Sequence, residues 1–201
     1  MTTPADIKAL LQHSAETLTQ WKPTLNDERK ELAFSFWSRL LENGKAILLL
    51  SEAALVNEAM TIHRLSIEHF ANMVGLLKGK VSPEELQKQA EADLPKQARY
   101  IHEDDIKEPT LTTENRERLQ RYRDSTEGNP VKDPGVNAYN LLHACDLGFI
   151  YLTYRSYSVS AAHSTILSAL REGDPTKAQD VLEHTKDLLT LAMAFVRETS
   201  T

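Results

Sequence analysis

The stretch from Leu55 to Leu77 repeats apolar residues with the period of a helix. One narrow stripe at 100° per residue holds Leu55, Ala59, Ile62, Phe70, Met73 and Leu77. A second apolar face, roughly opposite, holds Met60, Ile67, Ala71 and Val74. A helix that is apolar around most of its circumference packs other helices on both sides. We therefore predict a central helix near residues 55–78.

Helical spacing, broken by turn signals, also covers most of the remaining chain. It predicts helices over residues 4–20, 27–51, 82–102, 114–125, 136–157, 163–170 and 175–197. No stretch alternates as a strand does. The fold class expected is all-α, an antiparallel bundle of about six to seven helices. We expect one domain over residues 1–201, with a peripheral N-terminal helix within 1–25. Residues 103–135 are expected to form an insertion, a loop followed by a short polar helix.

Composition narrows the functions that fit this bundle. The chain has 201 residues, 41% of them hydrophobic, and a net charge of −6. That charge disfavours a function dominated by phosphate neutralisation, although a small basic site is compatible with it. No signal peptide or membrane-spanning run is evident, so we expect a soluble, cytoplasmic protein with no membrane partner. Cys145 is the only cysteine, which favours a buried core thiol.

Common cofactor and metal motifs are missing. The sequence has no Glu-x-x-His at its seven histidines, no His-x-x-x-His and no phosphate-binding glycine loop. We therefore expect neither a cofactor nor a metal.

Three weaker candidate features of the sequence have structural interpretations. We interpret residues 102–105 as a solvated acidic loop, the arginines of 116–123 as a salt-bridged solvent face, and His69 beside Ser66 as a packed, hydrogen-bonded histidine.

The most suggestive polar set spans two predicted helices. The central one carries Arg64 and Glu68, one turn apart, where an ion pair can form. The other helix and the segment after it carry Tyr151, Tyr154, Arg155, Ser158 and His163. Because buried polar groups need partners, these side chains either satisfy one another as a structural network or line a cleft as an active site. We predict an Arg64–Glu68 ion pair with Tyr151 and Tyr154 packed close to it.

At these residues the chain resembles a family of helical bacterial proteins grouped as domain of unknown function 5677. Glu58-Ala59-x4-Arg64-x3-Glu68 is similar to the E-A-x4-R-x3-E helix of that family. Tyr154-Arg155-x-Tyr157-Ser158 with His163-Ser164 is similar to its second motif, in which Ser160 is the alternative match to Ser158. The resemblance covers roughly residues 30–170 and implies an all-helical fold, without an assigned activity.

A more distant resemblance is to the HEPN proteins, helical bundles that include metal-independent ribonucleases. Their motif places an arginine four to six residues before a histidine, whereas seven residues separate Arg155 from His163 here. Two hypotheses follow, and the sequence leaves open whether the protein is an enzyme. The first is a protein-interaction or regulatory module in bacterial defence, with a protein partner or as a homodimer. The alternative is a HEPN-like ribonuclease or toxin acting on RNA, with Arg64, Glu68, Tyr154, Arg155, Ser158 and His163 as the candidate catalytic residues.

Overall fold

The computed structural model describes residues 2–22, 26–127, 131–162 and 175–199. Every regular element in these ranges is a helix, which confirms the predicted all-α class. Contacts divide the chain into two compact units. Unit 1 consists of Met1–Val81 and Asn137–Thr201, and unit 2 is Ser82–Val136. The insertion predicted over 103–135 falls inside unit 2, which begins earlier along the chain. The helix predicted over 163–170 lies outside the described residues.

Side-chain caps fix where the first helices begin. Helix α1 (Pro4–Trp21) starts with a capping box, in which Thr3 accepts from the Asp6 amide and the Asp6 carboxylate accepts from the Thr3 amide. Helix α2 (Glu28–Glu52) is capped by Asp27, whose carboxylate accepts from the Lys30 amide at 2.7 Å. These caps satisfy backbone amides that have no partner inside the helix.

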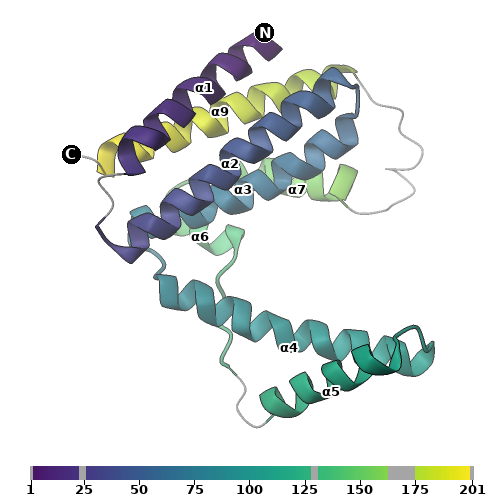
Figure 1. Cartoon of the computed structure of the whole chain (residues 1–201). Helices are drawn as coiled ribbons and strands as arrows, with labels where there is room; N and C mark the ends of the chain where they lie inside the picture. The colour runs from purple at the N-terminus through teal and green to yellow at the C-terminus, as the bar shows by residue number, and fades with distance from the viewer. Residues whose placement is uncertain (1, 23–25, 128–130, 163–174, 200–201) are drawn as a thin grey trace. The chain divides into compact units, whose positions relative to one another are not determined.

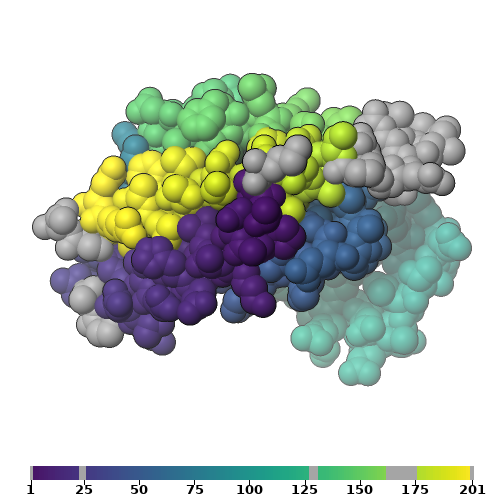
Figure 2. Space-filling view, turned by 90° about the horizontal axis from the view of Figure 1, so that it is seen from above, coloured from purple at the N-terminus to yellow at the C-terminus, as the bar shows by residue number. Residues whose placement is uncertain are grey.

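Helix α3 (Val56–Leu77) is the central element of unit 1, as predicted. It packs against α2, against α9 (Pro175–Thr199) and against the shorter helices that precede α9. Figure 2 shows α1 and α9 side by side on one face of this unit. The buried residues of α3 include Met60, Ile67, Phe70 and Val74. Leu55, which we had assigned to the main stripe, instead precedes the helix as its N-cap residue and is 45% exposed.

The single helix predicted over 136–157 is wrong. Two helices replace it, α6 (Ala138–Ala144) and α7 (Ile150–Tyr157), followed by the π-helix η2 (Ser158–Ala162). The break contains Asp146 with φ of +62°, which no helix accommodates. At Gly148 an added Cβ would lie 2.6 Å from the His143 ring. The change of direction leaves Phe149 and Leu152 exposed, although the helical period places them beside the buried Leu142 and Cys145.

Unit 2 is a hairpin of α4 (Pro83–Lys107) and α5 (Thr113–Glu127). Helix α4 continues past the predicted end near residue 102, so residues 102–105, which were expected to form an acidic loop, are helical. Asp105 is buried rather than solvated. Its carboxylate accepts from the amides of Thr110 and Leu111 and from the Arg116 side chain at 2.6 Å. One buried carboxylate therefore holds the turn between the two helices.

Candidate functional site

Four of the predicted site residues meet where α3 packs against α7 and η2. Arg64 Nε donates to Ser158 Oγ at 2.8 Å, and Arg64 Nη2 donates to the Tyr154 hydroxyl at 2.6 Å. The same Nη2 lies 3.2 Å from Glu68 Oε1, and the Tyr154 hydroxyl donates to that oxygen at 2.9 Å. The predicted ion pair and the packing of the tyrosine face against it are both confirmed.

This polar network lies at the surface rather than inside the core. The side chains of Arg64 and Glu68 are 26% and 33% exposed. Burial, and then the hydrogen bond to Glu68, raise the pKa of Tyr154, so its hydroxyl stays protonated and continues to donate. The Arg64 guanidinium carbon also lies 4.6 Å from the centroid of the Tyr154 ring. The rings of Tyr151 and Tyr154 stack with their centroids 5.2 Å apart. Arg64 is thus held by charge, hydrogen bonds and ring contact together.

The remaining candidates do not join this network among the residues that the structure describes. Arg155 is exposed on α7. Ser160 donates to the carbonyl of Ser156 in its own helical turn, so Ser158 is the serine that contacts Arg64. His163 lies outside the described residues. Ser66 donates to the Ile62 carbonyl, a local bond of the kind expected for a structural residue.

Sequence reasoning missed a second cluster, centred on His63 in the middle of α3. His63 is 1% exposed, and its Nδ1 lies 3.0 Å from the hydroxyl of Thr185 on α9. The ring meets Tyr157 edge-on at 5.4 Å and lies 6.1 Å from the ring of His184. The Tyr157 hydroxyl is 2.6 Å from Nδ1 of His184. The sequence does contain a signal for this cluster. His63 precedes the buried Ile67 by four residues, and helical spacing places both residues on the same face of α3.

Burial sets the protonation of this cluster. Desolvation, and secondly the charge of His184, lower the pKa of His63 to about 3, so the ring is neutral near pH 7. Burial, followed by the nearby Asp180 charge, raises the pKa of Tyr157. Burial likewise raises the pKa of the Cys145 thiol, which is buried as predicted. None of these groups carries a charge near neutrality.

Unit 2 carries two apolar grooves. The larger, about 730 Å³, is lined by residues that include Leu94, Pro95, Tyr122 and Val131. The smaller, about 300 Å³, is lined by residues that include Ile101, Leu111 and Leu119.

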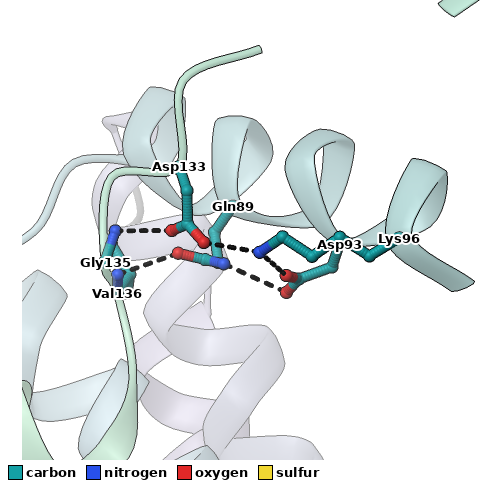
Figure 3. Close-up of polar contacts among 6 residues, drawn as sticks. All are labelled: Gln89, Asp93, Lys96, Asp133, Gly135 and Val136. Atoms are coloured by element: carbon teal, nitrogen blue, oxygen red, sulfur yellow. Dashed lines mark hydrogen bonds and ion pairs between the residues drawn. The ribbon is translucent and has the colours of Figure 1, made fainter. Parts of the chain in front are cut away.

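Figure 3 shows the polar contacts between α4 and the segment that follows α5. Lys96 donates to Asp133 at 2.6 Å, and the Val136 amide donates to the Gln89 side chain at 2.9 Å.

Within the described ranges, no group of three or more His, Cys, Asp or Glu side chains is placed to hold a metal ion. In the same ranges no helix combines the length and the apolar character needed to cross a membrane. Comparison with known proteins shows that residues 30–177 match the model of a family described as a family of unknown function (DUF5677). No curated protein and no solved structure matches the chain.

Proposed function

We propose that this chain, which belongs to the family of unknown function DUF5677, is a protein-interaction module that pairs with a second copy of itself through the α4–α5 hairpin. The observation that carries the proposal is the uncovered apolar face of that hairpin. A domain needs a second packed layer to bury such a face, and two helices alone supply only one. A cytoplasmic location and a role in bacterial defence or regulation belong to the same proposal.

The hairpin buries very little within its own unit. Helix α4 buries Ala92, Ala98 and Asp105, and no α5 residue whose side chain is described is buried. Large apolar side chains of the same unit remain at least 39% exposed, namely Leu94, Tyr100, Ile101, Ile106 and Val131. Leu94, Ala98 and Ile101 follow one another at spacings of four and three, which is the spacing of a helix–helix seam. Residues of α5 line the same grooves, yet Leu94 and Ile101 remain 51% and 49% exposed.

A second copy is the occupant that these features fit. Two identical hairpins form a four-helix bundle, in which each seam covers the other. The lining of the larger groove carries both signs of charge, with Glu91 and the basic residues Lys96, Arg99 and Arg123. In a twofold contact each acidic residue can therefore face a basic residue of the other copy. Lys96 and Arg99 already pair with acidic side chains of α4, and this favours self-pairing over binding of a strongly charged partner such as nucleic acid.

The mass of the full chain in solution tests this proposal. We expect sedimentation velocity at micromolar concentration to give a dimer for the wild type and a monomer for Leu94→Glu, because a carboxylate in the seam is buried without a partner. The matched control is Leu152→Glu, which changes a 74% exposed leucine on α7 of unit 1. It should leave the dimer intact. A monomeric wild type, or dissociation by Leu152→Glu alone, would overturn the proposal.

A metal-independent ribonuclease is the second candidate function. Its support is the partial exposure of the Arg64–Glu68 pair, since a guanidinium at the surface can reach an RNA phosphate. His163 would act as general base or acid, because an imidazole titrates near neutrality. Against this candidate, Arg64 already donates to Ser158 and Tyr154, as expected for a network that fixes helix register.

RNA cleavage in the presence of EDTA decides the second candidate. The ribonuclease candidate requires activity in the wild type and its loss in His163→Ala. His143→Ala is the control, because His143 is exposed and lies outside the network. Equal cleavage by all three proteins, or none by any, eliminates the ribonuclease.

A further inference from the structure

A cavity of about 250 Å³ lies between α3, α7 and α9, entirely within unit 1. His63 lines it from α3, Thr153 from α7, and His184 and Asp187 from α9. Its other lining residues are apolar, and they include Phe149 and Leu188. A cavity of roughly 150 Å³ already holds benzene, whereas drug-sized molecules need about 300 Å³ or more. The volume therefore suits a ligand slightly larger than benzene.

The hydrogen bonds of His63 define what the cavity offers a ligand. The Thr185 hydroxyl donates its hydrogen to the Val181 carbonyl at 2.7 Å. Its oxygen is therefore left to accept, and it accepts from Nδ1–H of His63 at 3.0 Å. This bond places the single ring hydrogen on Nδ1 and leaves Nε2 as a lone pair. Among the described residues no hydrogen bond to Nε2 is found, and the ring that carries this acceptor is 1% exposed and lines the cavity.

The groups around the cavity determine which sign of charge on a ligand the cavity favours. Its described lining contains the Asp187 carboxylate and no lysine or arginine. The Phe149 ring, which is 63% exposed, adds a π face that attracts cations. An acceptor lone pair, a carboxylate and an aromatic face all favour a donor with positive charge, and His184 is the one described lining residue that can itself carry positive charge.

We propose that this cavity binds a small organic amine in its ammonium form, with the ammonium between His63 Nε2 and Asp187 and the hydrocarbon part against the apolar wall. The proposal is independent of the hairpin, because all lining residues named belong to unit 1. It is also independent of the Arg64 network, with which the cavity shares no lining residue.

Binding of three probes of nearly equal size tests the sign of the ligand. Benzylamine is a cation, benzyl alcohol is neutral and benzoate is an anion at pH 7.5. We expect saturable changes in the His63 ring signals in NMR titrations of the full chain, with a Kd for benzylamine of about 1 mM or tighter. The Kd should be about threefold weaker for benzyl alcohol, since a partly exposed ion pair contributes little. Benzoate should bind at least about tenfold more weakly than benzylamine. Equal or tighter binding of benzoate, or no saturable change with benzylamine, overturns the proposal.

Two variants and one control variant test the location of the site. Asp187→Asn should remove the preference for benzylamine over benzyl alcohol, whereas Asp180→Asn should preserve it, because Asp180 is exposed on the same helix and does not line the cavity. Thr153→Phe fills the cavity and should abolish saturable binding of both probes. If folded Thr153→Phe binds benzylamine as the wild type does, the site lies elsewhere and the proposal is wrong. If that variant does not fold, the Asp187→Asn and Asp180→Asn pair decides the location alone.

Discussion

Arg64 and Tyr154 are joined twice, once by a 2.6 Å hydrogen bond between Nη2 and the hydroxyl and once by the guanidinium carbon 4.6 Å from the ring centroid. The Tyr154 hydroxyl also donates a hydrogen bond to Glu68 at 2.9 Å. One oxygen therefore links the Arg64 cation on α3 to the Glu68 anion one turn further along the same helix. This arrangement holds α7 against α3 at a fixed register. The network is therefore expected to contribute to the free energy of unfolding, whether or not it has a catalytic role.

Tyr154→Phe removes the linking oxygen and keeps the ring. We expect the free energy of unfolding to fall by about 1–2 kcal/mol, because a hydrogen bond to charged groups is lost while the ring packing remains. Tyr139→Phe is the control, since its hydroxyl has no hydrogen bond among the described residues and its ring packs on Tyr151. Urea titrations of both variants provide the comparison. Equal midpoints would show that the Tyr154 hydroxyl contributes nothing.

Glu68→Gln removes the charge from the same network. A fully buried ion pair broken on one side costs about 3–5 kcal/mol, but this pair is partly exposed, so we expect a loss of about 1 kcal/mol. The control is Glu42→Gln, from the Arg39–Glu42 pair whose side chains are 67% and 60% exposed. That change should alter the urea midpoint hardly at all. A loss as large in Glu42→Gln as in Glu68→Gln contradicts the prediction.

The Arg64–Glu68 pair could be predicted from sequence because both residues lie on one helix, where spacing determines geometry. The contact with Tyr154 required only that two strongly apolar helices pack against each other. The break at Asp146 could not be predicted by the same means. Its left-handed backbone leaves no mark in the apolar period, and the period alone therefore placed Phe149 and Leu152 on the same side as the buried Leu142 and Cys145. Helical spacing predicts which residues share a face only while the helix continues.

Asp105 shows a second limit of sequence reasoning. In the sequence it is the last of three consecutive acidic residues, and such runs are usually solvated. Its partners, Arg116 and the amides of Thr110 and Leu111, come from the turn that follows, so only the folded hairpin brings them together. The side chain of Arg116 was therefore correctly expected to form a salt bridge, but its partner was not identified.

Asp105→Asn should loosen the turn between α4 and α5. The hydrogen bond from Arg116, followed by the Leu111 amide, holds the pKa of Asp105 well below its usual value of 3.8. Its contribution to stability is therefore fully present above pH 3.8 and is lost as the pH falls below that value. We expect the amides of Thr110 and Leu111 to exchange hydrogen at least about tenfold faster in the variant at pH 7.

The control for the turn is Asp104→Asn, which changes an exposed carboxylate that contacts only Lys107 at 3.4 Å among the described residues. Exchange at the two amides should stay within about twofold of the wild type in this control. Unchanged exchange in Asp105→Asn would mean that the carboxylate does not hold the turn.

The last prediction concerns His63 and the dependence of stability on pH. The folded protein holds the pKa of His63 at about 3, below the ordinary value of 6.5, so between these values the unfolded chain binds the proton more tightly. Stability due to His63 is therefore fully present above pH 6.5 and decreases as the pH falls toward 3. Between pH 6.5 and 5 the stability lost through His63 amounts to at most about 2 kcal/mol, at roughly 1.4 kcal/mol per pH unit.

A variant of His63 isolates this loss, because acidic groups add the same pH dependence to the variant and to the wild type. We expect urea titrations at pH 7.5 and 5 to give His63→Gln a smaller loss of stability on acidification than the wild type. His13→Gln, which changes an exposed histidine on α1, should show the wild-type loss. If His63→Gln loses as much as the wild type does, then folding does not lower the pKa of His63, and the ring is protonated in the folded protein at pH 5.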